Sequence, residues 1–143
     1  MGIRLDFKDD GQVAVLTLAR PEARNALDIG MLDAIEASMR EVDRAGARIA
    51  VLQGDGSSFC SGADRWRFPG FTEAEGGEQH AQHAIRVGDR ACRAIAQATA
   101  VTVARLHGHV VGGGLALALA CDLRLADEDS LLSLPEVELG IPL

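Results

Sequence analysis

The sequence predicts an α/β fold with a buried sheet. Short apolar runs rich in β-branched residues alternate along the chain with longer segments whose apolar residues recur at helical spacing, and turn-forming residues stand between them. Alternation of this kind is typical of α/β architecture with a buried sheet. The 143 residues have the usual length of one domain and suffice for a hydrophobic core. We therefore expect one domain over residues 1–143.

The first half of the chain contains two predicted strands and one predicted helix. Residues 13–18 (VAVLTL) form a β-branched apolar run too short for a typical helix, which indicates a strand. The RPEARN segment follows as a loop. A helix then begins at Asp28, keeps its apolar residues at helical spacing, and ends at Gly46. Residues 49–52 are the next strand, before a turn rich in Gly and Ser.

The second half begins with a polar segment without periodicity, residues 68–79, which we expect to be a surface loop. A helix follows over about residues 79–98, with apolar residues on one face and arginines on or near the other. Residues 101–106 (VTVARL) indicate a further strand. Leu115–Ala120 is expected to be a buried helix, because Ala and Leu are strong helix formers and the run has no β-branched residue. Two short strands close the series, at residues 123–126 and 131–134.

Composition and charge argue against several function classes. The net charge of -7 argues against nucleic-acid binding, which rests on clustered positive charge. No apolar run reaches membrane-spanning length, and the N-terminal residues lack the apolar centre of a signal peptide, so we expect a cytoplasmic protein without membrane contact. Nearly all the cationic residues are arginine, whose planar fork suits phosphate, and this leaves small phosphorylated ligands open.

Three consecutive glycines, Gly112–Gly114, stand directly before the apolar run. Glycine permits close approach to the main chain, so these residues either make a tight strand-to-helix turn or present the first amides of a helix to a bound oxyanion. A carboxylate, Glu136, follows Pro135 in an otherwise apolar segment. It is either partly buried or on a turn that faces water.

Three other patterns favour ordinary structural roles. The GDG stretch at residues 54–56 resembles the start of a dinucleotide-binding fingerprint but lacks the third glycine. His107 and His109 share a face if that segment is a strand, yet no thiol or carboxylate nearby completes a metal site. Cys60 has no histidine that the sequence pairs with it, so a nucleophilic role is disfavoured. We expect no metal.

A resemblance to the crotonase family, the enoyl-CoA hydratase and isomerase superfamily, covers nearly the whole chain. It lies in four segments, which are ARPEARNALD (residues 19–28), VLQGDGSSFCSGAD (51–64), LHGHVVGGGLALALACDLRLAD (106–127) and PEVELGIP (135–142). The resemblance implies a fold of repeated ββα units, an acyl-CoA or enoyl-CoA substrate, and no cofactor beyond the CoA moiety. It also implies an oxyanion hole made by the amides of Ala63 and Gly113, where backbone donors stabilise a thioester enolate.

The same resemblance assigns residues that line the CoA thioester. The RPEARNAL loop matches the family segment that lies along the nucleotide and pantetheine, and Arg24 is suited to phosphate. An alternative for Arg24 is a solvated loop arginine. The positions carried over for binding are Arg24, Ala26, Ser61, Gly62, Ala63, Asp64, Gly112 and Gly113.

The chain departs from the family hydratases at one of their two glutamates. The position two residues after the triple glycine is Ala116, whereas the glutamate of the PE segment is present as Glu136. One carboxylate suffices to take a proton from one carbon of an enoyl-CoA and return it to another, so isomerisation is favoured over hydration, with Glu136 as general acid/base. Glu138 is a possible substitute for the second carboxylate, because residues i and i+2 share a face in an extended segment.

Family members are usually close to twice as long, so the resemblance implies a core truncated before the C-terminal helical part. We expect an exposed apolar edge and a tendency to associate. A homotrimer or hexamer is implied if the full family domain is present. The alternative hypothesis is a non-catalytic acyl-CoA-binding or assembly paralogue, or a fragment, supported by Ala116.

Overall fold

The computed structural model describes residues 2–64, 77–136 and 138, and its main sheet has five strands in the order β1-β2-β3-β4-β6. β1 runs antiparallel to β2, and the other neighbouring strands pair in parallel. Two short strands form a separate parallel sheet, β5 (His109–Val111) with β7 (Leu131–Ser133). The strands of the main sheet are β1 (Ile3–Lys8), β2 (Val13–Leu18), β3 (Ile49–Gly54), β4 (Val101–Leu106) and β6 (Leu123–Ala126).

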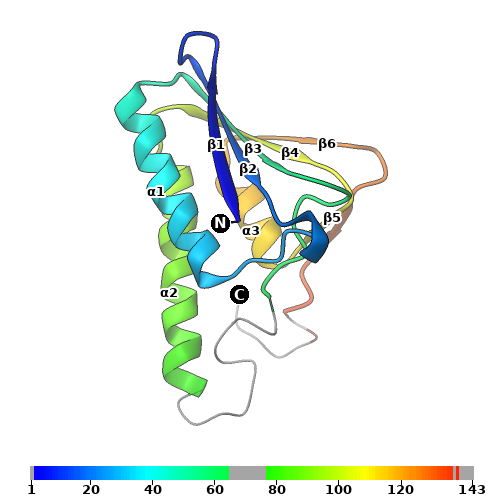
Figure 1. Ribbon diagram of the computed structural model, residues 1–143. Helices are drawn as coiled ribbons and strands as arrows, with labels where there is room; N and C mark the ends of the chain where they lie inside the picture. The colour runs from blue at the N-terminus through cyan, green and yellow to red at the C-terminus, as the bar shows by residue number, and fades with distance from the viewer. Residues whose placement is uncertain (1, 65–76, 137, 139–143) are drawn as a thin grey trace.

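The helices pack against one face of this sheet, where Figure 1 shows α1 and α2 side by side and α3 next to the strands. α1 (Ile29–Ala45) begins at the N-cap Asp28, whose Oδ1 accepts a hydrogen bond from the Met31 amide, and ends at Gly46 with φ 70°. α2 spans Gly77–Ala96 and α3 spans Gly113–Ala120. A 3-10 turn (Pro21–Ala23) lies between β2 and α1. No helix within the described ranges is both long and apolar enough to cross a membrane.

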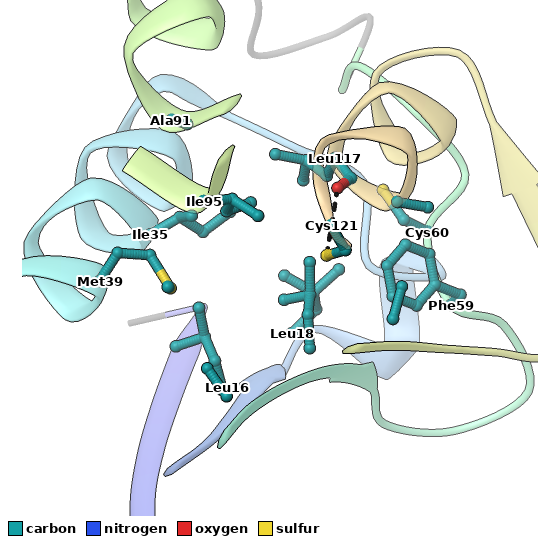
Figure 2. Close-up of a cluster of buried hydrophobic side chains, with 14 of the residues drawn as sticks. Leu16, Leu18, Ile35, Met39, Phe59, Cys60, Ala91, Ile95, Leu117 and Cys121 are labelled. Carbon is teal, nitrogen blue, oxygen red and sulfur yellow. Dashed lines mark hydrogen bonds between the residues drawn. The ribbon is translucent and has the colours of Figure 1, made fainter. Parts of the chain in front are cut away.

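The hydrophobic core lies between the helices and the sheet because alternate strand residues face the helices. Ala14, Leu16 and Leu18 of β2 are at most 2% exposed, and Ile35 of α1 and Ile95 of α2 pack over them. Figure 2 shows Leu16, Leu18, Ile35 and Ile95 in one cluster. Phe59, Cys60, Leu117 and Cys121 extend the cluster toward α3, where the Cys121 thiol donates to the Leu117 carbonyl.

Apolar side chains also remain in contact with solvent in two places. On the sheet face away from the helices, the register places Val13 beside Ile49 and Ile49 beside Val101, of which Ile49 and Val101 are 40% and 48% exposed. The second place lies at the end of α3, on edge strand β6 and around β7. Its leucines, each more than 40% exposed, are Leu119, Leu123, Leu125, Leu131, Leu132 and Leu134.

The predicted elements are largely confirmed, with three differences. β1 and β5 are additional strands, and the helix starting at Gly113 is only partly buried, because Ala116 is exposed and Leu119 is 57% exposed. The expected loop at residues 68–79 lies mostly outside the described residues, and its end is already helical because α2 begins at Gly77. The expected single domain over residues 1–143 stays a prediction.

Candidate functional site

The segment around Cys60 and strand β5 meet at the N-terminal end of α3, and hydrogen bonds between them fix their separation. The Cys60 amide donates to the His109 carbonyl at 3.0 Å, and the Val111 amide donates to the Cys60 carbonyl at 2.9 Å. Gly62, with φ 90°, comes next, and a Cβ added to it would lie 3.0 Å from the Val111 oxygen and 3.9 Å from the Gly113 nitrogen. Glycine therefore allows the two main chains to approach at this point.

The amide of Ala63 is oriented by the hydrogen bonds on either side of it. The Leu27 amide donates to the Gly62 carbonyl, and the Asp64 amide donates to the Leu27 carbonyl, each at 2.8 Å. Because the carbonyl and the N–H of a trans peptide point in opposite directions, the Ala63 N–H points away from Leu27. Within the described part of the chain this N–H has no hydrogen-bond acceptor.

The amide of Gly113 is the first of α3 and has no acceptor among the described residues either. Gly112 precedes it with φ 52° and ψ -119°, a conformation open essentially to glycine alone, and gives its own N–H to the Ser133 carbonyl at 2.9 Å. The Ala116 amide donates back to the Gly112 carbonyl at 3.0 Å, which starts the helix. The free N–H at the helix start adds the positive end of the helix dipole to this site.

Glu136 places its carboxylate against Gly112, the residue before the first amide of α3. It lies in a turn after β7, and its side chain is half-buried. A Cβ added to Gly112 would overlap its Oε1 and lie 3.3 Å from its carboxyl carbon. Its Oε2 is shielded from solvent and has no hydrogen-bond partner among the described residues. A buried carboxylate oxygen without a partner is uncommon and calls for an explanation.

The structure therefore brings together the residues that the sequence assigned to oxyanion binding and proton transfer. The peptide between Gly62 and Ala63, the amide of Gly113 and the carboxylate of Glu136 all lie at one end of α3. Ala116, three residues further along the helix, carries no carboxylate and is exposed. Glu138 is exposed as well. In the part of the chain that the structure describes, the end of α3 thus has the amides of Ala63 and Gly113, neither with an acceptor, beside the half-buried carboxylate of Glu136.

The loop assigned to CoA contacts is anchored through its backbone. The Ser61 amide donates to the Arg24 carbonyl at 3.0 Å, and the Ser61 hydroxyl donates to the Ala23 carbonyl at 3.3 Å. Arg24 has φ 49°, and its side chain is exposed, so the guanidinium is accessible to a ligand. Ala26 is half-buried, and the Asp64 side chain is only 10% exposed.

The residues with weaker site signals have structural roles. Burial raises the pKa of the Cys60 thiol to about 12, and the hydrogen bond from the Gly62 amide offsets this only in part. His107 Nε2 lies 2.9 Å from the Gly56 carbonyl, and His109 Nδ1 lies 3.3 Å from the Ser58 hydroxyl. Among the described residues, no group of three or more His, Cys, Asp or Glu side chains is placed to hold a metal ion.

Sequence reasoning missed two residues that hold this site together. Asn25 is fully buried, accepts from the Arg20 amide at 2.8 Å, and donates to the carbonyls of Asp55 and Ser58. Its φ of 55° lies in the left-handed region, which asparagine tolerates. This tolerance is the one property of the residue type that could have indicated its role from the sequence. Arg20 bonds both Asp28 and Asp64, and no local spacing reveals partners 8 and 44 residues away.

Comparison with known proteins gives consistent matches. A family model described as enoyl-CoA hydratase/isomerase matches residues 8–142. The "Probable enoyl-CoA hydratase" of Bacillus subtilis is 38% identical over 133 residues, which are 92% of this chain and 50% of the relative. Small ribosomal subunit protein mS47 of Schizosaccharomyces pombe is 30% identical, with 94% of this chain and 31% of the relative covered.

Solved structures agree with the sequence matches. An enoyl-CoA hydratase/isomerase family protein from Hyphomonas neptunium superimposes with a TM-score of 0.90 at 30% identity, covering 100% of this chain and 53% of the other. The chain spans about half the length of the curated relatives it matches first. The family-model match, the relatives and the shared architecture show that this chain belongs to the enoyl-CoA hydratase/isomerase (crotonase) family.

Proposed function

We propose that the protein acts on an acyl-CoA thioester by stabilising an enolate, and that it moves the double bond of an enoyl-CoA rather than hydrating it. The observation that carries this is the half-buried Glu136 carboxylate, which lies against Gly112 with one oxygen unpartnered among the described residues. A carboxylate beside two free amide donors suits proton abstraction next to a thioester carbonyl.

In this mechanism the amides of Ala63 and Gly113 donate to the thioester oxygen. As Glu136 removes a proton from the carbon next to the carbonyl, negative charge moves onto that oxygen, where the amides and the α3 dipole stabilise it. Glu136 then returns the proton further along the chain of a 3-enoyl-CoA. Because Ala116 provides no second carboxylate to activate water, isomerisation is favoured over hydration.

Substrate binding is proposed to use residues of the three segments around these amides. Arg24 is exposed and is placed to contact a CoA phosphate, while Ala26, Ser61, Gly62 and Gly112 provide backbone close to the pantetheine and thioester. Asp64 contributes to binding through its position in the loop, because its carboxylate accepts a hydrogen bond from Arg20. No cofactor beyond the CoA moiety is required for this chemistry.

The test is turnover of a 3-enoyl-CoA by the protein produced from its natural gene, compared with Glu136→Gln. Loss of the general base is expected to lower kcat by roughly 10²- to 10⁴-fold, with the substrate still bound. Glu138→Gln is the matched comparison, because this neighbouring carboxylate is exposed. Full activity in Glu136→Gln, or a loss in Glu138→Gln alone, contradicts the assignment of Glu136.

A second candidate function is a non-catalytic acyl-CoA-binding or assembly protein. Ala116 supports it, and so does the relative named as a ribosomal subunit protein. Calorimetry with a CoA thioester distinguishes the two candidates. Binding without turnover of 2-enoyl- or 3-enoyl-CoA favours the second candidate, and turnover that depends on Glu136 excludes it.

A further inference from the structure

Arg20 stands where the last residues of β2 lead into the loop before α1, and its guanidinium is enclosed. The side chain is only 14% exposed. Its Nη1 donates to the Ala26 carbonyl at 2.8 Å and to Asp28 Oδ2 at 3.3 Å, and its Nη2 donates to Asp64 Oδ2 at 3.0 Å. The planar fork of one arginine therefore joins three separate points of the chain.

Each of these points belongs to a segment that shapes the candidate site. Asp28 caps the first turn of α1, and Ala26 lies in the loop proposed to contact CoA. Asp64 directly follows Ala63, the residue whose amide is a proposed oxyanion donor. Arg20 thus connects the start of α1 to the peptide next to the proposed donor, through part-buried, charge-assisted hydrogen bonds.

The Asp64 contact adds a restraint that the backbone alone does not supply. The backbone bonds to Leu27 hold the Ala63 segment from one side. The bond from Arg20 to Asp64 holds it at the side chain and fixes residue 64 relative to the start of α1. Displacements of about 1 Å in a reacting group lower rates by about 10²-fold, so a restraint here is large enough to matter for turnover.

We propose that Arg20 is a positioning residue that, through Asp64, holds the Ala63 amide at the place where the enolate oxygen forms. This inference rests on the proposed function above. Arg20 does not touch the substrate in this proposal, and it acts only through Asp64 and the loop. Removing its charge takes away the cation that joins Asp28 to Asp64, and the Ala63 segment loses this restraint.

The test compares Arg20→Met and Arg20→Lys with wild type in steady-state turnover of a 3-enoyl-CoA. Arg20→Met is expected to lower kcat by about 10²-fold while KM changes by less than about threefold, because the donor shifts, whereas the backbone bonds of the CoA-contacting loop, such as that from Ser61 to Arg24, remain. Arg20→Lys is expected to retain only part of the activity, since an ammonium is a point charge and lacks the fork. Arg93→Met is the control, because Arg93 is 66% exposed and its one ion pair among the described residues is with Asp89.

A double-mutant cycle with Asp64→Asn separates positioning from general loss of structure. If Arg20 acts through Asp64, Arg20→Met combined with Asp64→Asn has a kcat no lower than the worse single variant. The proposal is overturned if the kcat losses of the two single variants multiply in the double variant. It is also overturned if KM rises in Arg20→Met by the same factor as kcat falls. Should Arg20→Met fail to fold by circular dichroism, Arg20→Lys carries the same comparison with the charge retained.

The outcomes separate this inference from the proposed function. Wild-type turnover with unchanged kcat in both Arg20 variants overturns the role of Arg20 and leaves the enolate mechanism intact. Absence of wild-type turnover with any enoyl-CoA overturns both. A kcat loss of the expected size in Arg20→Met, absent in Arg93→Met and not additive with Asp64→Asn, supports the inference.

Discussion

At the scale of the residue, Cys60 has a structural role next to the candidate site and is not proposed as a nucleophile. Its thiol donates to the Asn25 carbonyl at 3.1 Å and is fully buried. Burial raises the pKa of Cys60, and also that of Cys121, to about 12. Since these pKa values lie above the ordinary value of 9.0, both thiols are neutral at neutral pH, and their burial reduces stability only as the pH rises above about 9.

This pKa shift predicts the order in which the three cysteines react with iodoacetamide. At pH 8 a thiol with a pKa of about 12 is ionised in about one molecule in 10⁴, and the thiolate is the reactive form. Cys92 is only half-buried, so it is expected to be alkylated first. Peptide mass spectrometry over time measures the order. Alkylation of Cys60 ahead of Cys92 would point to an accessible nucleophile.

Individual residues also show where sequence reasoning stops. Glu136 and the glycines could be predicted as site residues because each lies in a motif that is local and continuous in sequence. Arg20 and Asn25 were not, because each acts on partners brought close only by folding, such as Ser58 for Asn25. The amide directions at Ala63 and Gly113 likewise depend on bonds from Leu27 and on helix formation.

At the scale of the element, the start of α3 depends on a close approach that only glycine permits. A Cβ added to Gly114 would lie 2.6 Å from the Cβ of Cys60 and 2.9 Å from its carbonyl oxygen. Real Cβ atoms do not approach backbone so closely, so α3 would shift away from the Cys60 segment. The first turn of α3 and the Gly62–Ala63 peptide would then separate.

We expect Gly114→Ala to lower the free energy of unfolding by about 1–3 kcal/mol, the usual size of an overpacking effect. Gly88→Ala is the matched control, because nothing lies within 4 Å of a Cβ at this position in α2. There the substitution is expected to raise stability by roughly 0.5–1 kcal/mol through helix propensity. Urea unfolding of the protein measures both values. Equal effects at the two glycines would contradict the packing seen at α3.

Among the elements, those with helical periodicity or a continuous apolar run were predictable, including the short strands β6 and β7, whereas β1 and β5 were not. α1 was bounded correctly, since Asp28 and Gly46 are recognisable caps. β1 was not predicted, because charged residues alternate with its apolar residues in IRLDFK. This alternation is the pattern of an edge strand exposed on one face. β5 has three residues and depends on β7, which pairs with it from more than 20 residues away.

At the scale of the whole molecule, the described residues leave a set of leucines in contact with water. Leu125 is 65% exposed on edge strand β6, and Leu131 is 60% exposed on β7. Apolar clusters of this kind normally mark a surface covered by other protein. Edge strands that expose apolar residues also favour pairing with another chain. The expectation of an exposed apolar edge is thus confirmed for the described residues.

The 143-residue chain studied by itself is therefore expected to bind a hydrophobic dye such as ANS and to self-associate at micromolar concentration. Leu125→Arg combined with Leu131→Arg is expected to reduce both, because the charges break the apolar surface. Val51 is half-buried on the face of β3 away from the helices. Val51→Arg tests whether this face also contributes to ANS binding and self-association. Light scattering of a monodisperse monomer without ANS binding would contradict this reading of the leucines.

The two amides at the start of α3 and beside Leu27 are main-chain atoms, and this affects how the site changes as sequences diverge. A side chain that performs chemistry is lost with one codon change, but an N–H persists through nearly every substitution at its position. Only proline removes it outright. The capacity to hold an oxyanion is therefore encoded mainly by the glycines and hydrogen bonds that shape the backbone, and it can outlast the carboxylates that once used it.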